Sequence, residues 1–132
     1  MRLSEAIRLG AMLKPQTTGH YRKAGATCAL GAAADAAGIK RDMDNKLFLR
    51  FPILSIEDWP EPPVKIQRPG FLASQGGQNP MSLYTVIWRL NDDAELTREQ
   101  IADYVATIEA RHDTRCAQYR AEAEAKYQEV HA

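Results

Sequence analysis

Cys28 is the residue whose type and setting could most readily support covalent chemistry. The alanine-rich run that follows it predicts a helix, and a thiol in the first turn of a helix lies at the positive end of the helix dipole. This field lowers the pKa of a thiol and favours the nucleophilic thiolate. A cysteine hydrolase also needs a histidine base, for which His20 is the candidate, and a polar oxyanion donor, for which Gln16 and Asn91 are candidates.

The surroundings of Cys28 fit a structural role as well. Alanines and Leu30 follow it, and a free cysteine packs as a small apolar side chain. The sequence alone therefore favours packing and leaves the catalytic pair of Cys28 and His20 as an alternative.

The sequence predicts no metal site and no cofactor. Residues 91–96 resemble the start of a calcium loop, but the best alignment puts the wrong residue types at three required positions: Arg89, Ala94 and Gln100. The three histidines are His20, His112 and His131, and no two of them lie three or four residues apart, as a metal-binding pair on one helix requires. Two cysteines cannot form a four-cysteine zinc site, and no phosphate-binding glycine loop of standard spacing occurs.

Two groups of large apolar side chains are candidate binding residues. Trp59 and Phe71 lie in a Pro/Gly-rich stretch, and aromatic anchors dominate the energetics of protein interfaces. Tyr119, Tyr127 and Val130 continue an apolar stripe near the C-terminus. The alternative for the loop aromatics is that both fold back onto the core.

The elements that position these residues belong to one domain. A length of 132 residues suits a single core, and 45% hydrophobic with 26% charged residues excludes wholesale disorder. No apolar run approaches the ~18 residues that span a bilayer. The start of the chain reaches Glu5 too early for a secretory signal, so we expect a cytoplasmic protein without a membrane association.

Four short helices are expected before the C-terminal one. The first is capped by Ser4 and ends before Pro15, and residues 15–26 read as a loop. The second is capped by Thr27 and ends at Gly38; its small residues suit a central helix that neighbours approach closely. The others cover residues 43–51 and 83–90, the latter favoured over a strand by its i, i+3, i+4, i+7 spacing.

An irregular loop is predicted over residues 52–81. Six of the seven prolines lie there, which forbids a long helix or a central strand. At most residues 64–66 form a short edge strand, which would belong to a small β hairpin.

The C-terminal helix gives the strongest signal. Residues 97–100 form a capping box, and no Gly or Pro follows them. Apolar or stripe positions then recur with an eleven-residue repeat: Ile101, Val105, Ile108, His112, Cys116, Tyr119, Ala123, Tyr127 and Val130. Such a helix is about 50 Å long, against about 35 Å for the domain, so we predict a helical domain over 1–110 and a helix extension over 111–132.

Charge divides unevenly along the chain. Residues 1–54 hold nine Lys/Arg and four Asp/Glu, a formal charge of +5, and the remainder carries −5. The division could complement itself within the fold, align subunits, or present a basic face to nucleic acid. Self-complementation is favoured because nucleic-acid binders usually carry a net positive charge.

Three stretches resemble a family of small uncharacterised proteins of bacteria and their phages: LSEAIRLG at 3–10, CALGA at 28–32, and LND at 90–92 with TREQIADYV at 97–105. The resemblance covers roughly residues 1–54 and 83–110. It implies a phage or prophage setting and a helical core, with no activity to transfer. The resemblance implies a central cysteine pair in several relatives, but this chain has no cysteine between Cys28 and Cys116, so no metal site is implied.

We therefore predict a mainly α domain whose function is protein–protein contact. The expected protein is a non-enzymatic phage or prophage accessory that modulates or inhibits a host factor, or that forms a homodimer through its C-terminal helix. The alternatives are a cysteine-dependent hydrolase or transferase using Cys28 and His20, and, more weakly, nucleic-acid binding by the basic N-terminal half.

Overall fold

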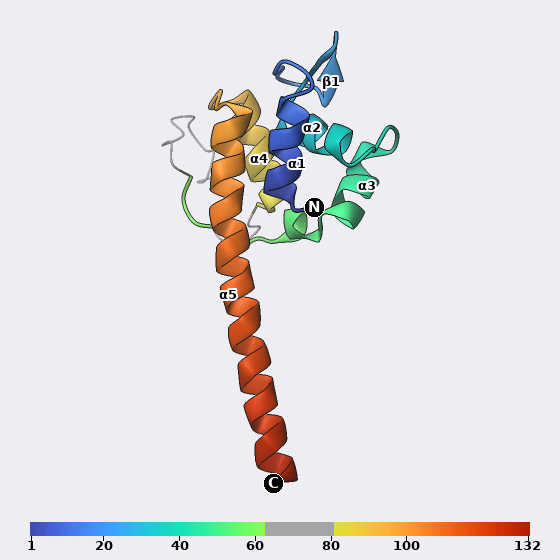
Figure 1. Cartoon of the computed structure of the whole chain (residues 1–132). Coiled ribbons are helices and arrows are strands. Elements are labelled where there is room, and N and C mark those ends of the chain that lie inside the picture. The colour runs from blue at the N-terminus through green and yellow to red at the C-terminus, as the bar shows by residue number, and fades with distance from the viewer. Residues whose placement is uncertain (63–80) are drawn as a thin grey trace.

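The computed structural model describes residues 1–62 and 81–132 and confirms a mainly helical domain with a long C-terminal helix (Figure 1). In chain order the elements are α1 (Leu3–Ala11), β1 (Arg22–Lys23), β2 (Ala26–Thr27), α2 (Ala29–Ala36), α3 (Met43–Arg50), the 3-10 helix η1 (Pro52–Ser55), α4 (Leu83–Asp92) and α5 (Arg98–His131). The strand proposed at 64–66, most of the predicted loop and Phe71 lie outside the described residues. Within the described ranges, no helix combines the length and apolar character needed to cross a membrane.

Helices α1 and α2 pack closely because small residues meet where they cross. A Cβ added to Gly10 of α1 would lie 1.8 Å from the carbonyl oxygen of Ala32 in α2. A Cβ on Gly31 would lie 2.0 Å from the carbonyl oxygen of Tyr21. Residues 29–34 of α2 are all buried, so the predicted central position of this helix is confirmed.

The predicted end of α2 at Gly38 is also confirmed. Gly38 has a φ of +74°, and the Ile39 N–H donates to the Ala34 carbonyl at 2.8 Å. The Gly38 N–H donates to the Asp35 carbonyl at 3.2 Å, which completes the pair of bonds typical of a glycine-terminated helix.

The predicted caps of the first two helices are wrong, whereas the cap of α5 is right. Ser4 is the second residue of α1 rather than its cap, and its hydroxyl binds Glu109. The cap of α2 is Cys28 rather than Thr27, and the Cys28 Sγ accepts the N–H of Gly31 at 3.3 Å. At α5, both hydrogen bonds of the predicted capping box are present.

Part of the predicted loop at 15–26 is a two-stranded hairpin. Strands β1 and β2 pair antiparallel, and the two residues between them, Ala24 and Gly25, have φ values of +50° and +80°. Positive φ at both positions is the geometry of the hairpin turns that match strand twist. An alanine at the first of these positions is unfavourable, which explains why the sequence did not signal a hairpin.

The core lies between α1, α2, α4 and the first third of α5. The helical reading of residues 83–90 is correct, because its four stripe residues are fully buried: Leu83, Val86, Ile87 and Leu90. In α5, Ile101, Val105 and Ile108 face this core, and Glu109 is the last buried residue of the helix.

Helix α5 extends well beyond the body of the domain (Figure 1). Its 34 residues correspond to a rod of about 50 Å. The predicted overhang is therefore present, and residues 111–132, called here the projecting segment, form it.

Candidate functional site

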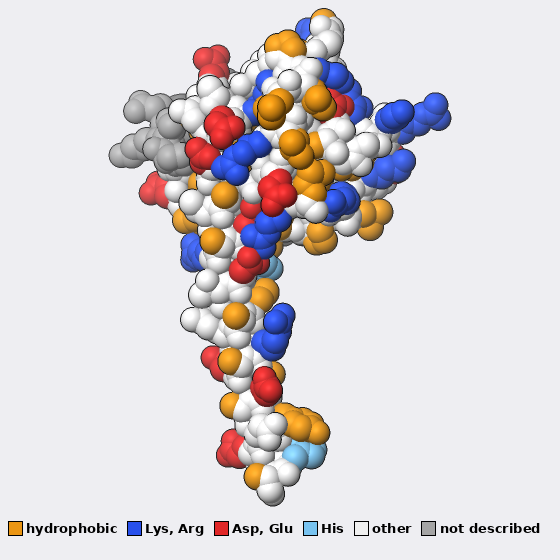
Figure 2. Space-filling model, in the orientation of Figure 1, with side chains coloured by type: hydrophobic (Ala, Val, Ile, Leu, Met, Phe, Trp, Pro, Cys, Tyr) orange, Lys and Arg blue, Asp and Glu red, His pale blue; other side chains and the backbone are white. Residues whose placement is uncertain are grey.

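The projecting segment carries large apolar side chains that the domain does not cover. Tyr119, Tyr127 and Val130 are 64%, 59% and 77% exposed. Figure 2 shows hydrophobic side chains among charged ones along this part of the molecule. The ring of Tyr127 stacks on that of His131 at a centroid distance of 4.0 Å, and both residues are exposed. The same stripe is thus buried in the first third of α5 and exposed in the last two thirds.

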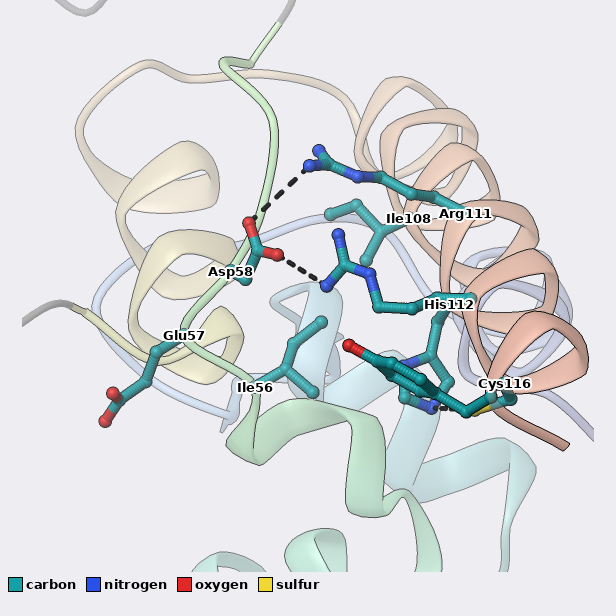
Figure 3. Close-up of a pocket in the computed structure, with 9 residues that line it drawn as sticks. Ile56, Glu57, Asp58, Ile108, Arg111, His112 and Cys116 are labelled. Carbon is teal, nitrogen blue, oxygen red and sulfur yellow. Dashed lines mark hydrogen bonds and ion pairs between the residues drawn. The ribbon is translucent and has the colours of Figure 1, made fainter. Parts of the chain in front are cut away.

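A hollow of about 380 Å³ lies at the base of the projecting segment (Figure 3). Ile56, Ile108 and Tyr119 contribute apolar lining. Asp58 pairs with Arg115 at 2.5 Å and Arg111 at 3.6 Å. The hydrogen bond from Arg115, followed by the charges of both arginines, lowers the pKa of the Asp58 carboxyl. These contacts fasten the 56–58 segment to α5 where the helix leaves the body.

A cysteine–histidine pair lies beside this hollow and was missed from the sequence. The Cys116 Sγ and the His112 Nε2 are 3.6 Å apart on consecutive turns of α5 (Figure 3). Spacing between histidines does not reveal this i, i+4 pair, because one of its partners is a cysteine. Across the described ranges, no three ligating side chains gather as a metal site would require.

Cys28 and His20 do line a common hollow, of about 300 Å³, between α2, α3 and α4. The sequence had offered His20 only as a candidate partner for Cys28, without showing that the two side chains lie near each other. Cys28 is nearly buried at 5% exposure, whereas His20 is exposed at the rim.

The electrostatics of Cys28 oppose the expected activation. Burial raises the pKa of the Cys28 thiol, and this outweighs the hydrogen bond that the Gly31 N–H donates to the sulfur. The nearby Asp92 carboxylate raises the same pKa further. The expectation of a thiolate favoured by the helix dipole is therefore reversed, because the sulfur is desolvated where the dipole acts.

The proposed oxyanion donors have other partners. The Gln16 Nε2 donates to the Asn91 Oδ1 at 2.9 Å and to the Leu96 carbonyl at 2.8 Å. Asn91 is buried in α4; its Oδ1 also accepts the Ala29 N–H, and its Nδ2 donates to Thr17 and Asp92. These amides join the 16–17 loop, α2 and α4, which is a structural role that spacing along the chain did not indicate.

The rest of this hollow is aromatic and acidic. Tyr21, Tyr84 and Trp88 line it together with Asp44 and Asp92. The hydroxyls of Tyr21 and Tyr84 contact each other and both reach the Asp44 Oδ1. Burial raises the pKa of both tyrosines, so they stay protonated and donate hydrogen bonds.

Trp59 is half-buried against the core. Its Nε1 donates to the Met81 carbonyl at 2.8 Å, which ties the two ends of the described chain on either side of residues 63–80. The structure thus places Trp59 against the body of the domain, in the position expected if the loop aromatics fold back.

In the described part of the chain, two basic residues of the N-terminal half pair with acids far along the sequence. Arg2 pairs with Asp113, and Arg8 pairs with Glu99 and Asp103. These pairs support the interpretation that the two halves complement each other in charge within one fold.

No family model matches this chain, and no similar protein was found among curated sequences or solved structures. The function must therefore be inferred from the geometry.

Proposed function

We propose that this protein works by protein–protein contact through the projecting segment. The observation that carries this proposal is the exposure of Tyr119, Tyr127 and Val130 on one face of a helix that its own domain leaves uncovered. Exposed aromatic side chains on a rigid helix are typical anchors of an interface, because little conformational entropy is lost when they are buried.

Ion pairs hold the start of the projecting segment against the body of the domain. Asp58 holds Arg111 and Arg115, while Asp113 at the same level pairs with Arg2. These ion pairs surround the first turn of the projecting segment, and the continuous helix α5 sets its direction relative to the body. A partner therefore meets a preformed helix face.

A second copy of the chain and a different protein are both candidate partners. The exposed stripe continues the face of α5 that packs against its own domain, so two copies aligned in parallel along it would bring their domains into collision. A homodimer along the stripe is therefore expected to be antiparallel. The resemblance to phage proteins favours the other candidate, a host factor whose activity the protein modulates or inhibits.

The test replaces the stripe without changing the fold. A variant with Tyr119, Tyr127 and Val130 changed to serine is compared with a matched variant in which Ala121, Ala125 and Gln128, which lie off the stripe, become serine. Both are measured by light scattering for self-association and as immobilised bait for proteins of a bacterial lysate.

We expect the stripe variant to lose self-association or specific partners that the matched variant retains. Equal behaviour of the two variants and the natural chain, with the same proteins bound or none, would refute the proposal. Circular dichroism should show both variants folded, because every substituted side chain lies outside the core.

Cysteine chemistry at Cys28 and His20 is the second candidate function. Its one supporting observation is that both side chains line the same hollow. The raised pKa of the Cys28 thiol counts against it, since the nucleophile would be protonated at neutral pH.

A further inference from the structure

The hollow between α2, α3 and α4 has a composition that the proposed contact function does not use. Three aromatic side chains, Tyr21, Tyr84 and Trp88, line it with two carboxylates, Asp44 and Asp92. Neither Lys nor Arg is among its lining residues in the described part of the chain. The hollow is thus both π-rich and negatively charged.

Each carboxylate is held by neutral donors rather than by a cation. The Asp44 Oδ1 is the acceptor for both tyrosine hydroxyls, with Tyr84 at 3.0 Å. The Asp92 Oδ1 accepts the Nδ2 of Asn91 at 2.8 Å. Among the residues that the structure describes, neither aspartate makes an ion pair within 4.0 Å, whereas Asp35, Asp58 and Asp113 each do. Among the described residues, the two oriented carboxylates in this hollow therefore have no ion-pair partner.

The aromatic walls are positioned by packing. Tyr84 packs against the Phe48 ring at a centroid distance of 5.0 Å, and the hydrogen bonds to Asp44 hold the edges of both tyrosines. Trp88 is 41% exposed, and the guanidinium of the neighbouring Arg89 lies over its ring at 5.0 Å from the centroid, so this indole already attracts one cation. Aromatic faces attract ammonium and guanidinium groups, and the attraction increases when water is excluded.

We infer that this hollow binds an organic cation, an ammonium group carried on a short aliphatic chain. The cation contacts the aromatic side chains that line the hollow and is neutralised by Asp44 and Asp92. A volume of about 300 Å³ accommodates a small alkylammonium ion or the end of a lysine side chain. The site is separate from the projecting segment, so it does not depend on the proposed contact function.

The test is a calorimetric titration of the full chain with choline, in parallel with 3,3-dimethylbutan-1-ol, the neutral compound of the same shape. We expect saturable binding of choline and at least tenfold weaker binding of the neutral alcohol. Asp92→Asn, which keeps the side-chain size, and Trp88→Leu should each weaken choline binding about tenfold. The matched control, Glu95→Gln, removes a nearby charge outside the hollow and should leave affinity unchanged.

A second pair of ligands identifies the source of the ammonium group. Binding of a lysine-containing peptide but not of choline would assign the site to a protein side chain, and binding of both would assign it to small cations as well. Equal affinity for choline and the neutral alcohol would refute the inference. So would an unchanged affinity in Asp92→Asn, or the absence of saturable binding of both the peptide and choline.

Discussion

The crossing of α1 and α2 predicts that a single methyl group will destabilise the domain. In a helix free of tertiary contacts, replacing glycine by alanine stabilises by about 1 kcal/mol, because glycine carries the larger entropy cost. At Gly10 the added Cβ would lie 1.8 Å from the Ala32 carbonyl oxygen and 2.6 Å from its Cα. The steric clash lowers the free energy of unfolding, whereas the intrinsic helix preference of alanine raises it. The sign of the measured change therefore shows which of the two effects is larger.

The magnitude follows from the distances. Ordinary contacts between non-bonded heavy atoms lie at about 3.5 Å, so the two helices would have to separate by roughly 1.5 Å at their crossing. The added Cβ is fixed in place by the backbone of α1, and the atoms it meets are backbone atoms of Ala32, so neither side can rotate away. Overpacking a core typically costs 1–3 kcal/mol, and we expect Gly10→Ala to reach at least about 3 kcal/mol, a fall in Tm on the order of 10 °C.

The assay is urea denaturation followed by circular dichroism, with Leu9→Ala as the control. Leu9 is the neighbouring residue of α1 and is 50% exposed, so its truncation should change the free energy of unfolding by less than about 1 kcal/mol. Removing the Ala32 side chain in the Gly10→Ala background should not restore stability, because the clash involves Ala32 backbone atoms. A Gly10→Ala protein as stable as the natural chain, or more stable, would refute the close crossing.

Three further predictions test other parts of the structure. Cys116 should react with a maleimide at the rate of an exposed thiol, whereas buried Cys28 should react at least a hundredfold more slowly at pH 7, as measured by mass spectrometry. Rapid labelling of Cys28 would instead favour the enzymatic alternative. Asn91→Ala should lower the free energy of unfolding by about 3 kcal/mol, because it leaves buried partners in α2 and in the 16–17 loop unsatisfied, and a loss below 1 kcal/mol in urea titrations would contradict this role. Burial raises the pKa of Asp35, but ion pairs with Lys14 and Arg22 outweigh burial and leave that pKa below its value in the unfolded chain. The stability that these pairs contribute is present above about pH 4 and is lost as the pH falls, so the natural chain and Asp35→Asn should differ less in free energy of unfolding in acid than at neutral pH. A difference that does not change with pH would contradict this prediction.

Features with a local signal were predictable from the sequence. The capping box at Thr97 and Gln100, the glycine after α2, and the eleven-residue repeat of α5 each depend on residues a few positions apart. The length of α5 relative to the domain predicted its overhang by arithmetic alone. These features are fixed by backbone geometry, which a short stretch of sequence determines.

Contacts between distant residues were not predictable. The backbone N–H of Ser4 donates to the Glu109 carboxylate at 3.2 Å, across 105 positions of the sequence. This N–H in the first turn of α1 therefore finds its acceptor in α5 rather than in a serine cap. Arg98 is buried, and it donates to the Thr27 hydroxyl and to the Lys14 carbonyl. A charged residue in the first turn of a helix gives no indication that it lies inside the core.

The candidate sites show the same limit. The stripe of Tyr119, Tyr127 and Val130 could be read along one helix, because its spacing matches the helical period. The aromatic and acidic hollow combines residues from the 19–21 loop, α2, α3 and α4, so only the packing of these elements reveals it. The sequence favoured a packed Cys28 and offered His20 as a catalytic partner, but it could not show that burial outweighs the helix dipole and raises the pKa of the thiol.

The unbroken course of α5 restricts how its length can change. Each residue inserted into a helix turns everything beyond it by about 100° and moves it by about 1.5 Å. One residue added between Asp113 and Thr114 would leave Ile108 in the core and swing Tyr119 and Tyr127 around the axis to a different side. Eleven added residues make close to three complete turns and would restore the original orientation. Variants of this protein that keep the same outward-facing tyrosines should therefore differ in tail length by nearly whole numbers of turns, such as about seven or eleven residues, rather than by single residues.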